Sequence, residues 1–200
     1  MLPLVLALTG CATVAPGLQQ EGVQTHLLAV PAAPRGGSGS GPELLVAPPT
    51  ARAGLDSPRM VYLQRPFEVS YYARNEWADT PARMLQPLLV QSVEAGGAFR
   101  AVVAGPSPAA ADLRLDTEVL ALQQEFLSES SVTRVALRAQ VVDLASRRVV
   151  ATETFEAVEP AVSGDPYGGV VAINRALERV LGELTAFVSR VGTARRSLPP

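Results

Sequence analysis

Hydrophobic and polar residues alternate in three segments of the second half of the chain, a pattern typical of half-buried β-strands. The clearest alternation covers residues 112–119, where apolar side chains are separated by charged ones. Residues 132–142 alternate again, and residues 148–157 follow after a turn at 143–147. Because strands joined by short turns pair antiparallel, these segments predict an antiparallel meander.

Shorter apolar runs predict further strands in the first half of the chain. Residues 60–63 and 67–72 are expected to form a hairpin, because a short polar connection separates two runs rich in aromatic and β-branched residues. Alternation within the second run assigns Phe67, Val69 and Tyr71 to one face. Single strands are also expected at 25–30, 43–47 and 99–103.

Two segments carry the spacing of an amphipathic helix. The first begins after Thr80, whose hydroxyl suits an N-cap, with Pro81 at the first helical position, and ends at Gly96. The second follows a loop at 160–169. Its apolar stripe is formed by Val170, Ile173, Leu177, Val180, Leu181, Leu184, Phe187 and Val191. So wide a stripe favours packing on a sheet over self-association in a coiled coil.

These elements predict an α/β fold of the α+β type. We expect a single domain with a mixed, largely antiparallel sheet packed against two main helices, of which the second is C-terminal and long. The boundaries we assign are a signal peptide at 1–10, a lipidated tether at 11–24, the folded domain at 25–191 and a disordered tail at 192–200.

The first residues predict a lipid anchor. The apolar run from Leu2 to Leu8 is far too short to span a bilayer. The four residues that end at Cys11 resemble a lipobox, and Cys11 is the only cysteine of the chain. We therefore expect cleavage before Cys11 and a covalent lipid on its sulfur. The following residue is Ala12 rather than the aspartate that retains such proteins in the inner membrane, which favours the outer membrane.

Composition limits the function classes. The net charge is −2 and no basic block is present, so the chain lacks the footprint of a nucleic-acid-binding protein. One histidine and no second cysteine make a metal site or a disulfide a poor expectation. The covalent lipid on Cys11 is the only non-protein group that the sequence predicts, and no cofactor is expected.

The search for catalytic residues gives no strong candidate. His26 is the sole histidine and lies near a predicted strand start, where placement at a surface or sheet edge is favoured over a role as general base. Residues 164–169 are glycine-rich but lack the spacing and the lysine of a phosphate-binding loop, so they are interpreted as a helix entry.

One aromatic patch stands out where the predicted hairpin leads into the first helix. It contains Tyr72, Arg74 and Trp77, the only tryptophan of the chain. Aromatic side chains with a polar end suit both the edge of a core and a contact with a partner. We expect these three residues at the core edge or in a partner contact, and packing at the core edge is favoured for Trp77.

The chain resembles the ABC-type transport auxiliary lipoprotein family, which includes the paraquat-inducible C-type lipoproteins. The matching segments span nearly the whole mature chain. They are the lipobox, Leu27-Leu28, Val46-Ala47-Pro48-Pro49 with Leu55, Met60-Val61-Tyr62, the pattern Tyr72-x-x-Asn75-x-Trp77-Ala78-Asp79-x-Pro81, Leu85 and Leu88, Phe155, and Ala176-Leu177. One departure is Glu76, where the family pattern often has an arginine directly before the tryptophan.

The resemblance implies a non-enzymatic periplasmic role. Members of the family are partners of ABC transporters whose substrate-binding component carries a mammalian-cell-entry (MCE) domain, and such systems move lipids or other hydrophobic molecules between the membranes. The expected partners are therefore an MCE-domain protein, the ABC transporter components and the membrane that holds the lipid anchor. The expected location is the periplasmic face of the outer membrane.

Two alternatives remain open from the sequence. A structural lipoprotein of another envelope or secretion complex would use the long helix or the hairpin edge to contact further copies of itself, forming a homo-oligomer. A periplasmic hydrolase is the least favoured interpretation, because neither a nucleophile motif nor a base beyond His26 is present.

Overall fold

A computed structural model describes residues 22–31 and 39–196 of the chain. Cys11, the predicted signal peptide and most of the predicted tether lie outside these residues, as do residues 32–38 and 197–200. The strands are β1 Gln24–His26, β2 Glu43–Val46, β3 Thr50–Ala51, β4 Arg59–Arg65, β5 Glu68–Trp77, β6 Ala101–Ala104, β7 Leu113–Glu125, β8 Val132–Asp143 and β9 Arg148–Pro160. The helices are α1 Pro81–Ala95 and α2 Pro166–Arg196.

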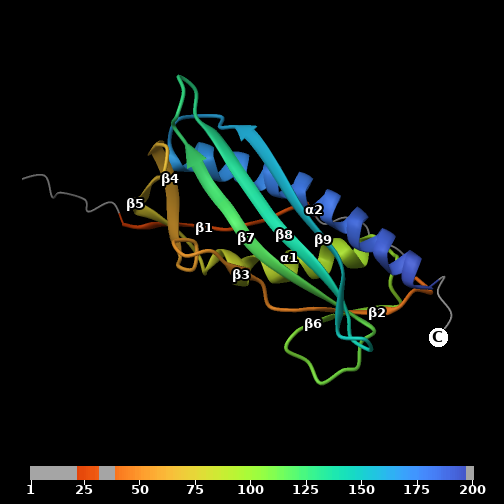
Figure 1. Ribbon diagram of the computed structural model, residues 1–200. Helices are drawn as coiled ribbons and strands as arrows, with labels where there is room; N and C mark the ends of the chain where they lie inside the picture. Colours follow the sequence, from red (N-terminus) through yellow and green to blue (C-terminus); the bar gives the residue numbers. More distant parts are fainter. Residues whose placement is uncertain (1–21, 32–38, 197–200) are drawn as a thin grey trace, which may run out of the picture.

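The described strands form one nine-stranded sheet, and both helices pack on the same face of it (Figure 1). The sheet does not close, and the helix-free face is open. The predicted meander is confirmed, because β7 pairs antiparallel with β8 and β8 with β9 along nearly their whole lengths. The predicted fold class, a single α+β domain with a long C-terminal helix, is also confirmed.

Strand β7 carries the pairing of the whole sheet. One of its edges is taken by β8, and the other is shared by β2, β3 and β4, each parallel to β7. The chain passes once along β7 and pairs with it in three short stretches, first β2, then β3 and then β4. The traverse is interrupted at Pro48-Pro49, because proline lacks the N–H that a ladder requires. Strand β3 has no counterpart among the sequence predictions.

The core lies between the sheet and the two helices. Alternate residues of β7 and β8 face the apolar stripes of α1 and α2, as the periodicity predicts. Phe155 of β9 packs against Phe187 of α2 with ring centroids 5.7 Å apart. Trp77, at the end of β5, is also part of this core and is 2 % exposed.

Both helices begin at caps that the sequence contains. Thr80 accepts a hydrogen bond from the backbone N–H of Arg83, and Pro81 follows it, as predicted. At α2 the Asp165 carboxylate accepts from the backbone N–H of Gly168 at 2.7 Å. This cap and Pro166 start α2 within the stretch that was expected to be a loop up to residue 169.

The expectation of a disordered tail from residue 192 is wrong for residues 192–196, which continue α2. The reason is a polar contact at the far end of the domain. Arg195 donates from Nε to the Asp143 carboxylate at 2.7 Å, and the backbone N–H and hydroxyl of Ser146 donate to the same carboxylate. Hydrogen bonds from Ser146 and Arg195 lower the pKa of Asp143 to about 2. The last turn of α2 is thereby tied to the β8–β9 turn.

A second correction concerns Phe67, which the alternation places within a strand, on one face with Val69 and Tyr71. The hairpin itself is confirmed, but β5 begins at Glu68 and Phe67 lies in the turn. Its side chain is 104 % exposed and Val69 is also exposed. The preceding Pro66 cannot donate a hydrogen bond to a ladder. The pairing of β5 with β4 therefore begins at Glu68, one residue after the start of the predicted run.

The contrast between two phenylalanines provides a matched test of this core. Phe155→Ala is expected to lower the free energy of unfolding by about 3–5 kcal/mol, because it removes a buried ring and leaves a cavity. Phe67→Ala is expected to change it by less than about 0.5 kcal/mol, because that ring makes no core contact. Urea unfolding followed by circular dichroism measures both; equal losses would contradict the assignment of Phe67 to the surface.

Candidate functional site

Three connections of the chain meet at one end of the sheet, which we call the loop end. They are the β4–β5 turn at 66–67, the β7–β8 loop at 126–131 and the β9–α2 loop at 161–165. The register brings them together, because β4 ends beside the last residues of β7, and β8 begins between the ends of β7 and β9. Figure 1 shows these connections together at the upper left, where α2 also begins.

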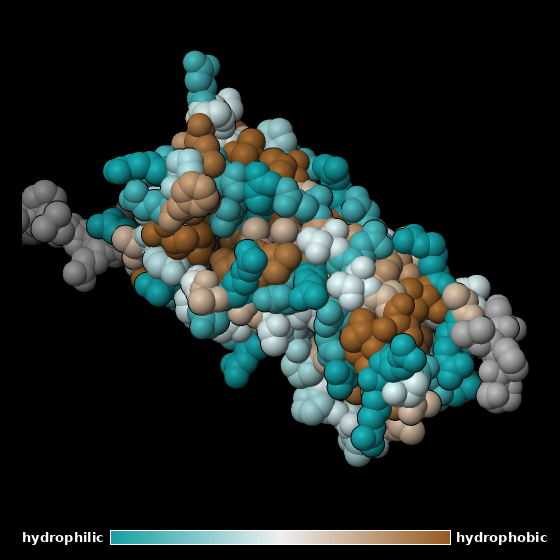
Figure 2. All heavy atoms as spheres, viewed as in Figure 1, coloured by the Kyte–Doolittle hydropathy of each residue, from teal (hydrophilic) through white to brown (hydrophobic). Residues whose placement is uncertain are grey.

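The loop end exposes large apolar side chains from all three connections. Phe67 is fully exposed and Tyr167, in the first turn of α2, is 65 % exposed. Val69, Leu127 and Val162 are exposed beside them. Figure 2 shows hydrophobic surface at this end, over the β4–β5 hairpin. Large apolar side chains exposed at one end of a domain are candidates for a contact with something outside it.

The backbone of Phe67 is unusual. Its φ of 69° lies in the left-handed region, which favours glycine and costs a side-chain-bearing residue about 1–2 kcal/mol. The turn thus holds a bulky ring in solvent at a position where glycine would be more stable. Because the ring does not pack in the core, it is a candidate for a contact outside the domain.

Beneath the exposed side chains lies a buried polar chain centred on Gln124, which is 1 % exposed. The Tyr72 hydroxyl donates to Gln124 Oε1 at 2.8 Å, and Gln124 Nε2 donates to the Ser131 hydroxyl at 3.1 Å. Burial raises the pKa of Tyr72, with the charges of Tyr62 and Asp165 acting in the same direction, so the phenol stays neutral and can donate. This chain connects β5, β7 and the β7–β8 loop.

Close packing fixes Gln124 in place. A Cβ added at Gly169 would lie 2.2 Å from Gln124 Oε1, so only glycine lets α2 approach this amide. On the other side, the Tyr62 and Tyr72 ring centroids are 4.6 Å apart, and Phe126 meets Tyr62 edge-on at 6.1 Å. The first turn of α2 and the β4–β5 hairpin are therefore held against the same residue of β7.

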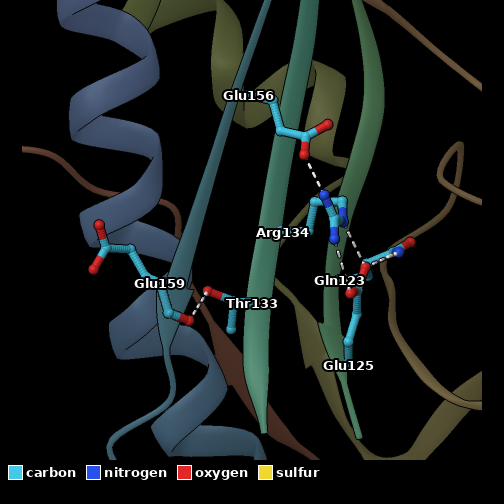
Figure 3. Close-up of polar contacts among 6 residues, drawn as sticks. All are labelled: Gln123, Glu125, Thr133, Arg134, Glu156 and Glu159. Atoms are coloured by element: carbon cyan, nitrogen blue, oxygen red, sulfur yellow. Dashed lines mark hydrogen bonds and ion pairs between the residues drawn. The ribbon is translucent and has the colours of Figure 1, made fainter. Parts of the chain in front are cut away.

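The adjacent residue, Glu125, carries a buried charge. Arg134 of β8 donates to its two carboxylate oxygens at 2.8 and 3.2 Å, and Gln123 donates at 2.8 Å. Figure 3 shows the guanidinium of Arg134 between Glu125 and Glu156, with which it also pairs. Burial alone would raise the pKa of Glu125, but the hydrogen bonds from Arg134 and Gln123 and the Arg134 charge lower it below its ordinary value.

The structure separates the three residues predicted as a core-edge or partner patch. Trp77 is buried in the core, whereas Tyr72 is half-buried at the loop end and Arg74 is exposed along β5. His26, in β1, forms a hydrogen bond with Asn75 Oδ1 at 2.8 Å and lies at an edge pairing, as expected. Cys11 lies outside the described residues.

Sequence reasoning missed Phe67, Gln124 and the Glu125–Arg134 pair. A signal for the polar pair was present, because Gln123-Gln124-Glu125 breaks the alternation of an otherwise half-buried strand. For Phe67 the signal was the preceding proline, which places it in a turn. Neither signal predicts which residue each side chain contacts.

Two hollows lie elsewhere on the described residues. One, of about 400 Å³, is lined by Val30, Pro31, Ser92, Ala95, Gly96, Glu178, Leu181, Gly182 and Thr185, between α1 and α2. The other, of about 310 Å³, lies on the open face among charged residues of β7 and β8. Residues 22–31 and 39–196 contain no cluster of acidic, histidine and cysteine side chains arranged for a metal ion. Within these ranges, no helix is long and apolar enough to span a membrane.

Solved structures share this fold. Protein XCC0632 from Xanthomonas campestris superposes with a TM-score of 0.78 at 25% identity, covering 88% of this chain and 100% of that chain. An uncharacterized protein matches with a TM-score of 0.64 at 13% identity over 85% of this chain and 98% of that one. The hypothetical protein CT253 from Chlamydia trachomatis matches with a TM-score of 0.50 at 13% identity, over 76% and 98% respectively. Curated proteins gave no match.

The fold and its open sheet therefore define a class of small α+β domains seen in several bacterial proteins. A family model described as the ABC-type transport auxiliary lipoprotein component matches residues 26–185. The match covers most of the chain and nearly all of the core, which extends to Phe187 and Val188. The chain belongs to this family, which confirms the resemblance found in the sequence.

The Glu125–Arg134 pair allows a prediction about stability and pH. Arg134→Met is expected to lower the free energy of unfolding at neutral pH by about 2–3 kcal/mol, because it leaves the Glu125 carboxylate buried without its partner. The loss is below that for a fully buried pair because about a third of Arg134 is exposed. Because the pKa of Glu125 is lowered on folding, this stabilisation is present above its ordinary value of 4.5 and is lost as pH falls through the folded value.

Urea unfolding at neutral and acidic pH measures this difference. The gap between wild type and Arg134→Met should narrow as the carboxyl becomes protonated. The double variant Glu125→Gln/Arg134→Met serves as the control and should be more stable than Arg134→Met alone, because no charge is left buried. A gap independent of pH would contradict this account of the pair.

Proposed function

We propose that the chain is a periplasmic lipoprotein, anchored by a covalent lipid on Cys11, that acts as a non-enzymatic auxiliary of an MCE-type ABC transport system. Such a system moves lipids or other hydrophobic molecules across the envelope. The family match over residues 26–185 is the single observation that carries this proposal. The MCE-domain protein and the transporter components are the proposed partners.

The polar groups at the loop end support a binding rather than a catalytic role. Tyr72, Gln124 and Ser131 satisfy one another, and Glu125 is neutralised by Arg134. A general base or nucleophile needs a free lone pair directed at a substrate, whereas these groups hold strands and loops in place. His26 forms its hydrogen bond with Asn75, away from the loop end.

The sequence on the N-terminal side of the folded domain supports the lipid anchor. Cys11 ends a stretch that resembles a lipobox, and ten residues separate it from Gly22, where the described chain begins. Ala12 favours the outer membrane, as stated above. Two or three acyl chains such as palmitate would hold the domain firmly, since each buried methylene contributes about 0.8 kcal/mol.

The proposed lipid anchor predicts that detergent partitioning separates the wild-type protein from a variant without the lipid. Wild-type protein expressed in a Gram-negative host is expected to enter the detergent-rich phase on Triton X-114 partitioning, and its N-terminal peptide should begin at a lipid-modified Cys11. Cys11→Ser should remain in the aqueous phase, because no thioether can form on a hydroxyl. An unmodified Cys11 in the mature wild-type chain would overturn the anchor.

The transporter partnership predicts a defined set of co-purified proteins. Tagged wild-type protein from detergent-solubilised envelope is expected to recover an MCE-domain protein together with its permease and ATPase, identified by mass spectrometry. An unrelated tagged lipoprotein from the same envelope is the control and should recover none of them. Cross-linking to a closed ring of this chain alone, with no transporter component, would instead support a structural lipoprotein of another envelope assembly.

A further inference from the structure

The exposed apolar side chains at the loop end remain unexplained by a partnership with a transporter. We propose that the loop end lies against the surface of the bilayer that holds the anchor, with Phe67 and Tyr167 inserted into its interfacial region. This inference rests on the proposed lipid at Cys11. It adds an orientation and a second membrane contact that the anchor alone does not require.

The side chains at this end suit a membrane interface. Phe67, Leu127 and Val162 come from three separate connections, so the apolar surface is not the by-product of one amphipathic element. Tyr167 adds a ring with a polar tip, the kind of side chain enriched at the boundary between headgroups and acyl chains. Val69 flanks Phe67 on β5.

Phe67 is the strongest single observation. The turn exposes the whole ring and holds its backbone at a φ of 69°, where glycine would relieve the strain. Both features oppose folding stability in water. Transfer of the ring into an apolar medium compensates for them, because burial of a phenylalanine side chain is strongly favourable.

The described chain begins on the same side as the loop end. Strand β1 runs parallel to β5, which leads away from the hairpin turn, so the chain before Gln24 comes from the direction of that turn. Residues 12–21 can span at most about 35 Å. Figure 1 shows the described chain entering on the side of the loop end and α2 ending at the opposite end. With a tether of that reach, a lipid on Cys11 and the loop end can contact the same bilayer.

Charge explains which membrane contact is expected. Three arginines near the loops are paired: Arg65 with Glu68, Arg134 with Glu125 and Glu156, and Arg179 with Glu159, whereas Arg175 of α2 is exposed. Glu129 and Asp165 add negative charge at the same end. An electrostatic attraction to anionic lipids is therefore not the driving force. Insertion of apolar side chains into a zwitterionic surface is the contact that fits.

Fluorescence quenching in vesicles tests the orientation. Full-length lipidated Phe67→Trp and Tyr167→Trp are reconstituted in phosphatidylcholine vesicles with brominated acyl chains. The native Trp77 is 2 % exposed and provides a constant background. Each introduced indole is expected to lose about half of its emission, because interfacial tryptophans reach the upper acyl chains. Replacing part of the lipid with phosphatidylglycerol should not increase the quenching.

The matched control lies at the opposite end of the sheet. Val149, in the first part of β9, is 54 % exposed, and Val149→Trp is expected to show no more quenching than wild type. Equal quenching at both ends, or none at Phe67→Trp and Tyr167→Trp, would overturn the inference and leave the loop end to a protein partner. Vesicle flotation separates this result from failure of the anchor: protein that floats without quenching retains its anchor, and protein that does not float loses both.

Discussion

The pairing of both edges of β7 is the constraint on which the rest of the structure depends. One edge binds β8, and the other aligns β2, β3 and β4 in sequence, so that a single traverse of the chain is laid against one strand. Hydrogen bonds between these strands continue the ladder, as from Ala47 N–H to the Leu115 carbonyl. A shift of β7 by one residue would turn its buried side chains to the open face and displace every neighbour.

The last residues of β7 extend this constraint into the loop end. Gln124 and Glu125 interrupt the apolar alternation, and each is buried with partners from other strands. Because an unpaired buried polar group is costly, these contacts fix the positions of the hairpin and of the β7–β8 loop. The apolar side chains above them are carried by connections whose flanking residues these contacts hold in place.

The secondary-structure elements that depend on neighbouring residues can be predicted from the sequence, whereas the pairing between distant segments cannot. Alternation from 112 to 157 predicts the meander, and Thr80-Pro81 predicts the start of α1, because both depend on neighbours in the chain. Strands β2, β3 and β4 share one edge of β7. This arrangement depends on contacts between residues far apart in the chain, and the periodicity of a single segment cannot predict such contacts. Phe67 was misplaced because an apolar run ordinarily marks a strand, whereas Pro66 ends the pairing before it.

The length of α2 separates the loop end from the surface at the opposite end of the sheet. This helix of 31 residues is about 46 Å long and runs from the loop end to the opposite end of the sheet. Its last turn is tied to the end of β8 by the hydrogen bond from Arg195 to Asp143. With the loop end against a bilayer, the exposed Val149 and Val150 face away from it. In this proposed orientation one end of the sheet contacts the membrane, and the other end, about the length of α2 away, is left for the proposed transporter partners.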